Sequence, residues 1–105
     1  MNNKLETISN LFEDKEIRSI WDSEKEEYYF SVVDVISALT ESKDPSRYWK
    51  TLKSRMIQEG NETVTKCGTL KLKAKDGKMR YTDMLDTKNI FRLIESIPST
   101  KAELL

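Results

Sequence analysis

The alternation of apolar and polar residues is clearest over residues 70–83, which read LKLKAKDGKMRYTD. The Asp76-Gly77 pair stands between two alternating runs, and such a pair is typical of a two-residue type I′ hairpin turn. This turn sets a register in which Lys73 lies opposite Arg80. Because side chains alternate along a strand, the expected hairpin has one apolar and one cationic face. The apolar face holds Leu70, Leu72, Ala74, Met79 and Tyr81, and the cationic face holds Lys71, Lys73, Lys75, Lys78 and Arg80.

A second hairpin is predicted nearer the N-terminus. Residues 16–21 and 28–32 are rich in β-branched and aromatic side chains and flank the polar turn 22–25. The aromatic residues are Trp21, Tyr28, Tyr29 and Phe30. Aromatic side chains on strands are able to stack on nucleic-acid bases, but core packing is their usual role. Residues 1–11 form a separate N-terminal segment with the apolar spacing of a short helix.

Two helices are expected after this hairpin. Ser31 and Asp34 occupy the N-cap and N3 positions of a capping box, and apolar residues follow at helical spacing over residues 32–39. A second helix begins at the Asp44-Pro45 pair, because Asp is a favoured N-cap and Pro fits the first helical position. The pattern therefore predicts a tight helix–helix connection.

The second helix, which we expect to end near Gln58, is amphipathic and basic. On a wheel of 100° per residue, the face opposite its apolar stripe carries Arg47, Lys50 and Lys53. A solvated face is the commoner reason for three cations on a helix. Two short helices joined tightly also outline a helix-turn-helix, whose second helix enters DNA. Both interpretations stay open at this point.

The remaining elements complete the expected fold. Residues 60–68 form a polar loop bounded by glycines, and a last helix begins after Asp86 and ends before Pro98. The pattern as a whole predicts an α+β fold, a small single domain in which short β-hairpins pack against three or four helices.

Charge is unevenly distributed, although the net charge is zero. Residues 1–42 hold four Lys/Arg against ten Asp/Glu, a net charge of −6, and residues 43–80 hold eleven against four, a net charge of +7. A concentrated basic region favours an acidic partner, most often nucleic acid. Such blocks also arise by chance in a chain that is 34% charged. Charge alone therefore favours a nucleic-acid partner but does not establish one.

The residue inventory argues against catalysis and metal binding. There is no histidine, which excludes His-based triads and His metal sites. The single cysteine, Cys67, lies beside Lys66, which would lower its pKa, but it lacks a His or a second Cys as a partner. Helix capping explains Asp83 and Asp86 better than a magnesium site does. We therefore expect no enzyme activity, no catalytic residue, no metal and no cofactor.

The expected location is the cytoplasm. No apolar run approaches transmembrane length, and residues 1–10 lack the basic and apolar regions of a signal peptide. A lone cysteine without a disulfide partner fits a reducing compartment. We therefore expect no contact with a membrane.

Three stretches resemble the BRO family N-terminal domain (Bro-N), found in phage antirepressor-like proteins and large DNA viruses. They are residues 29–35 with Ala38-Leu39, residues 44–49, and residues 76–83 with 90–94 and Ser96. The resemblance implies an α+β DNA-binding domain related to the KilA-N fold, in a bacterial phage- or prophage-type transcriptional regulator. It also implies that residues 12–105 form this domain and lack its usual C-terminal continuation.

The favoured hypothesis is that the chain binds duplex DNA through the basic hairpin and the basic helix face. The expected contact residues are Lys71, Lys73, Lys75, Lys78, Arg80, Arg47, Lys50 and Lys53. Five phosphate contacts from the hairpin predict a log–log salt slope of about −4 to −5. The alternative is a protein-interaction module that binds a repressor or another regulator through the acidic N-terminal half. A homodimer is compatible with the first hypothesis, because many DNA readers are two-fold symmetric.

Overall fold

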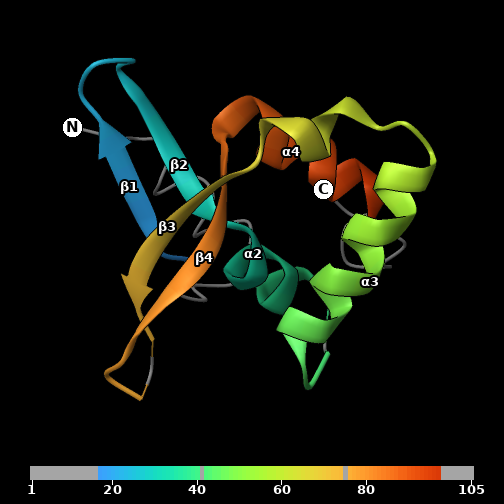
Figure 1. Cartoon of the computed structure of the whole chain (residues 1–105), viewed down its shortest axis with the longest axis horizontal. Coiled ribbons are helices and arrows are strands. Elements are labelled where there is room, and N and C mark those ends of the chain that lie inside the picture. The colour runs from blue at the N-terminus through green and yellow to red at the C-terminus, as the bar shows by residue number, and fades with distance from the viewer. Residues whose placement is uncertain (1–16, 41, 75, 98–105) are drawn as a thin grey trace.

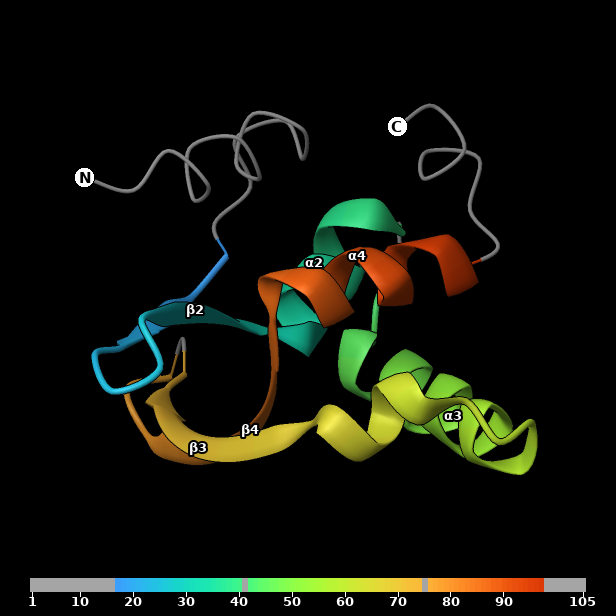
Figure 2. The same ribbon diagram turned by 90° about the horizontal axis from the view of Figure 1, so that it is seen from above.

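The computed structural model describes residues 17–40, 42–74 and 76–97, so the predicted N-terminal segment 1–11 lies outside it. The described residues form a curled antiparallel sheet in the order β1-β2-β4-β3, with the helices gathered to one side (Figures 1 and 2). The elements are β1 Ser19–Asp22, β2 Glu27–Ser31, α2 Val32–Leu39, α3 Pro45–Gln58, the 3-10 helix η1 Glu62–Lys66, β3 Gly68–Lys73, β4 Met79–Asp86 and α4 Thr87–Ser96. The α+β prediction is confirmed. None of the described helices is long and apolar enough to cross a membrane.

The helices begin at the predicted caps. The side chains of Ser31, Asp44 and Asp86 each accept a hydrogen bond from the backbone N–H three residues on, at 3.4, 3.1 and 2.9 Å. These bonds satisfy amides that have no partner inside the helix. The predicted ranges of α2 and α3 are confirmed, and the polar loop 60–68 contains η1.

The core lies between the sheet and the helices. Phe30 of β2 and Leu85 of β4 are cross-strand neighbours on adjacent strands, and both are fully buried. Their neighbours from the helices include Val35, Ile36, Trp49, Leu52, Met56, Ile90 and Leu93. The prediction of core packing is confirmed for Phe30. It is wrong for Trp21, which is 49% exposed on the edge strand β1 and packs its ring 4.8 Å from that of Tyr28.

The β3–β4 hairpin is present, but its register differs from the predicted one by a single residue. Lys73 pairs with Met79, not with Arg80, and Lys71 pairs with Tyr81. A one-residue slip moves a side chain to the opposite face of a sheet. The predicted separation into a cationic and an apolar face is therefore wrong. One face combines Lys71 and Lys73 with Met79 and Tyr81, and Arg80 lies on the other.

The slip comes from the length of the turn. Ala74 N donates to Lys78 O at 2.8 Å, and Gly77 N donates to Ala74 O at 2.9 Å. Gly77 has a left-handed φ of 85°, and Asp76 accepts from Lys78 N at 3.0 Å. This is the three-residue loop in which a turn is followed by a left-handed glycine bulge, instead of a two-residue type I′ turn.

Much of this hairpin extends beyond the sheet (Figure 1). Strand β2 pairs with β4 only from Met84 to Asp86, so the rest of β4 pairs with β3 alone. We call residues 70–74 and 76–82 the hairpin arm. Three of its large apolar residues are exposed: Tyr81 by 75%, Met79 by 56% and Leu70 by 43%. The face with Lys71, Lys73, Met79 and Tyr81 is therefore exposed, whereas the opposite face includes the half-buried Leu72 and the buried Thr82.

Candidate nucleic-acid interface

Asp83 joins the base of the hairpin arm to α3. Its carboxylate accepts hydrogen bonds from Trp49 Nε1 at 2.7 Å and Lys53 Nζ at 3.0 Å, both on α3, and from Thr69 Oγ1 on β3 at 3.2 Å. Burial by itself raises the pKa of this carboxyl. The bonds from Trp49 and Lys53, the charge of Lys53 and the bond from Thr69 outweigh burial, so the pKa lies below its ordinary value of 3.8. Asp83 is therefore charged at neutral pH and fixes α3 against the arm.

This contact gives Lys53 a structural role. Its ammonium forms an ion pair with Asp83 and lies 5.8 Å from the centroid of the Trp49 ring. The Asp86 carboxylate caps α4, whereas the Asp83 carboxylate is bonded to α3, so the two carboxylates do not converge on a magnesium site. Among the described residues, no group of His, Cys, Asp and Glu side chains is arranged to hold a metal ion.

The arm face that continues from Asp83 carries both cations and apolar groups. We call it the lysine–tyrosine face: Lys71, Lys73, Met79 and Tyr81, all exposed. The Lys71 ammonium lies 5.2 Å from the centroid of the Tyr81 ring, within the range of a cation–π contact. In the observed register, each lysine of this face lies opposite an apolar side chain, whereas the predicted register set Lys73 opposite another cation, Arg80, and like charges in that position repel each other.

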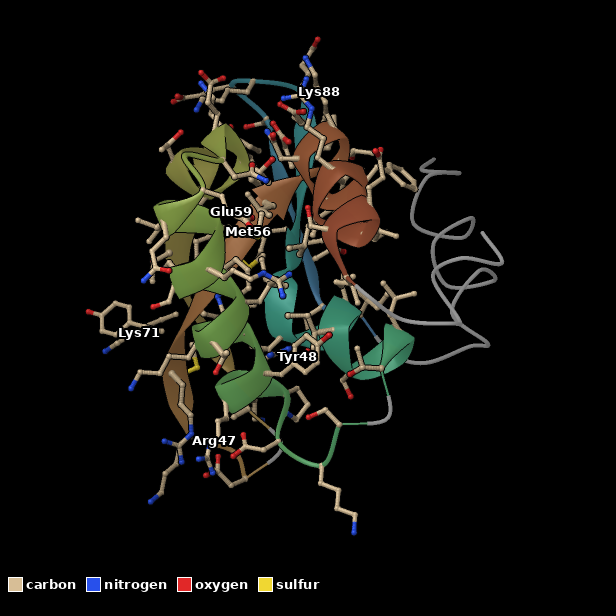
Figure 3. All side chains as sticks on the ribbon, turned by 90° about the vertical axis from the view of Figure 1, so that its right-hand side faces the viewer. Arg47, Tyr48, Met56, Glu59, Lys71 and Lys88 are labelled. Atoms are coloured by element: carbon tan, nitrogen blue, oxygen red, sulfur yellow. The ribbon has the colours of Figure 1, made fainter. Side chains whose placement is uncertain are left out.

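The outer face of α3 supplies the other cations. Arg47 and Lys50 are exposed, and within the described part of the chain neither forms an ion pair. Both line a shallow depression with Asp44, Ser46, Thr51 and Ser54. In Figure 3, Lys71 lies to the left of α3 and Arg47 lies at its lower end, whereas Tyr48 lies on the side toward α2. The predicted basic helix face is therefore reduced to Arg47 and Lys50.

An open groove of about 770 Å³ separates the start of α3 from the arm. It is lined by Arg18, Ser19, Val33, Asp34, Ser37, Pro45, Ser46, Leu72, Lys73 and Ala74. Arg18 spans its floor: Nε and Nη2 donate to the Asp34 carboxylate at 2.7 and 3.0 Å, and Nη1 donates to the Lys73 carbonyl at 3.1 Å. The arm is thus tied to α2 as well as to α3.

The structure does not bring all the predicted contact residues together. Arg80 lies on the opposite face of the arm and forms an ion pair with Asp76 at 2.5 Å. The hydrogen bond from Arg80, followed by one from the Lys78 backbone, lowers the pKa of Asp76. Lys78 is exposed in the turn, and Lys75 lies outside the described residues. Of the eight predicted residues, Lys71, Lys73, Arg47 and Lys50 therefore form the candidate interface.

Cys67 is not an activated thiol. Burial, followed by the nearby negative charge of Asp83, raises its pKa to about 11, although Lys53 acts in the opposite direction. The expected effect of the neighbouring Lys66 is thus absent. A thiol with so high a pKa is a poor nucleophile near neutral pH, because the thiolate is the reactive form.

Sequence reasoning missed the roles of four residues in this region. Arg18 and Asp34 are 16 residues apart, and no local pattern signals their contact. Asp83 was considered only as a cap or a metal ligand. The exposure of Tyr81 depends on the register, which an Asp-Gly pair does not determine on its own.

The comparison with known proteins identifies the family. The family model described as "BRO family, N-terminal domain" matches residues 16–105. The chain therefore belongs to this family, and the resemblance seen in the sequence motifs is confirmed. It is a family of regulatory, DNA-binding domains and not of enzymes. No curated protein and no solved structure matches the chain.

Proposed function

We propose that this domain binds duplex DNA through the lysine–tyrosine face of the hairpin arm and the outer face of α3. The observation that carries the proposal is the hairpin register, which turns Lys71 and Lys73 to the same side of the arm as Asp83. Because Asp83 bonds to α3, this side adjoins the helix that carries Arg47 and Lys50. Membership of the BRO family supports a DNA-binding role in a phage- or prophage-type transcriptional regulator of the bacterial cytoplasm.

The geometry fits the shape and charge of a duplex. A two-stranded ribbon is narrow enough to enter the major groove, and exposed lysines beside it reach phosphates. Neutralising each phosphate steepens the log–log salt slope by about 0.9, so contacts from four cations give about −3.6. Arg47 is the residue of this set best suited to read a base, because a guanidinium binds guanine through two hydrogen bonds.

Fluorescence anisotropy with a random-sequence duplex across a salt series tests the proposal. The variants Lys71→Gln/Lys73→Gln and Arg47→Gln/Lys50→Gln should each reduce the slope by about 1.8. The matched control is Lys88→Gln/Arg92→Gln, which removes two exposed cations from α4, and its slope should equal that of the wild type. Figure 3 shows Lys88 at the end of the molecule away from Arg47. A wild-type slope near zero would overturn the proposal.

A second candidate function is supported by the β1–β2 turn. Glu24 and Glu26 are exposed there, and Asp22 orders the turn by accepting from the backbone N–H groups of Glu24 and Lys25 at 3.0 and 3.2 Å. In Figure 1 this acidic turn lies at the opposite end of the sheet from the tip of the arm. Such a turn suits contact with the basic surface of a repressor, as the antirepressor role requires.

The two functions are separable by substitution. The variant Glu24→Gln/Glu26→Gln should lose binding to a repressor in a pull-down and keep the DNA affinity of the wild type. If the arm variant Lys71→Gln/Lys73→Gln instead loses the repressor, the acidic turn is not the docking surface.

A further inference from the structure

We propose that Tyr81 and Met79 enter the major groove between the phosphate contacts of Lys71 and Lys73, and that they recognise the C5-methyl groups of thymine. The inference rests on the proposed binding of DNA by the hairpin arm. It adds an apolar component to that binding and names the base chemistry the arm would read.

The first argument is exposure. Tyr81 is 75% and Met79 is 56% exposed, whereas Phe30 and Leu85 of the same sheet are fully buried. The two residues are two positions apart on β4, so their side chains project from the same face of the ribbon. The pair is flanked by the exposed lysines Lys71 and Lys73, and an exposed apolar patch rimmed by polar side chains is typical of an interaction surface.

The second argument is the arrangement of charge. Lys71 lies directly opposite Tyr81, and Lys73 lies directly opposite Met79. Each apolar side chain thus has a lysine as its cross-strand partner, which favours a polyanion over an apolar protein surface as the occupant. The cation–π contact of Lys71 with Tyr81 also restrains the ring before binding, which reduces the entropy lost when the complex forms.

The third argument is the shape of the arm. Over the paired residues Leu70 to Lys73 and Met79 to Thr82, β3 and β4 pair only with each other, so the arm is two strands wide. The major groove admits a ribbon of this width and exposes the thymine methyl, which is the apolar group available on a base edge there. Apolar contact with this methyl therefore matches the two side chains that the arm presents.

The test compares two duplexes of the same sequence, one with thymine and one with deoxyuridine in its place. The wild type should bind the thymine duplex more tightly, by about fourfold for each methyl group that is buried. The variant Tyr81→Ser/Met79→Ser should lose this ratio and keep the salt slope of the wild type, because it removes no charge. Since both residues are exposed, the variant should retain the fold, and circular dichroism checks that it does.

The controls separate the possible failures. Phe91→Ser, which alters a partly exposed aromatic residue on α4, should keep both ratio and slope. Arg47→Gln/Lys50→Gln should reduce the slope and keep the ratio. Equal binding of the two duplexes by the wild type overturns the inference and leaves the proposed function standing. A wild type that binds neither duplex overturns the proposed function itself.

Self-association is the remaining outcome to exclude. If sedimentation shows a wild-type dimer that Tyr81→Ser/Met79→Ser converts to a monomer with unchanged affinity for DNA, the apolar pair contacts a second copy of the chain. That result also overturns the inference.

Discussion

The Trp49 indole N–H donates to the Asp83 carboxylate at 2.7 Å, across 34 residues of sequence. This bond links α3 to the base of the hairpin arm, and Lys53 strengthens it with an ion pair to the same carboxylate. The two segments that carry the candidate interface are therefore held together before any ligand arrives. Such preorganisation reduces the ordering that binding requires.

Removing the carboxylate should destabilise the domain. In Asp83→Ala, the N–H of Trp49 loses its acceptor in a residue that is only 5% exposed. An unsatisfied buried donor costs about 1–3 kcal/mol of unfolding free energy. Urea unfolding measures the loss, with Glu95→Ala on the exposed side of α4 as a control that should match the wild type. A loss no larger than that of the control would show that the bond contributes nothing.

The same carboxylate should make stability depend on pH. Its pKa is lower in the folded state than the ordinary value of 3.8, so the charged form stabilises the fold. This contribution is complete above the unfolded pKa and is lost as the pH falls through the folded pKa. We expect the difference in unfolding free energy between the wild type and Asp83→Asn to stay constant above about pH 5 and to shrink below about pH 4. A difference that does not change down to pH 3 would contradict the assignment.

Replacing the left-handed glycine of the hairpin turn should destabilise the domain, whereas replacing a glycine with ordinary backbone angles should not. Gly77 has a φ of 85°, and a Cβ added there meets no atom within 4 Å, so the penalty of Gly77→Ala is that of the backbone alone. We expect a loss of about 1 kcal/mol. Gly68→Ala is the matched control, because Gly68 also has open space but no left-handed φ. Thermal unfolding should show a lower Tm for the first variant only.

The thiol of Cys67 should react slowly. With a pKa of about 11, few molecules carry the thiolate near pH 8. Alkylation by iodoacetamide, followed by mass spectrometry, should be far slower than that of free cysteine and should accelerate as the pH approaches 11. A rate equal to that of free cysteine at pH 8 would show that the group is neither buried nor shifted.

The helices were predictable because their signals are local. A cap at Ser31, Asp44 or Asp86 acts on amides within three residues, and the observed bonds follow that rule. The register of the arm was not predictable in the same way. Asp76-Gly77 is compatible with a two-residue and with a three-residue loop, and the difference of one residue decides which side chains share a face.

The candidate interface was predicted only in part for a related reason. The exposure of Arg47 and Lys50 follows from the period of one helix, which the sequence shows directly. The partner of Lys53 and the side of the arm that adjoins α3 depend on Asp83, 30 residues beyond that lysine. Contacts between distant segments follow from the fold as a whole and carry no local signature.

The most direct test of the account is a titration of the ¹⁵N-labelled protein with a short duplex, followed by NMR. The account predicts that amide shifts concentrate at the lysine–tyrosine face of the arm and along α3 near Arg47 and Lys50. Shifts confined to the acidic β1–β2 turn, or no shifts at low salt, would contradict the assignment of this surface to DNA.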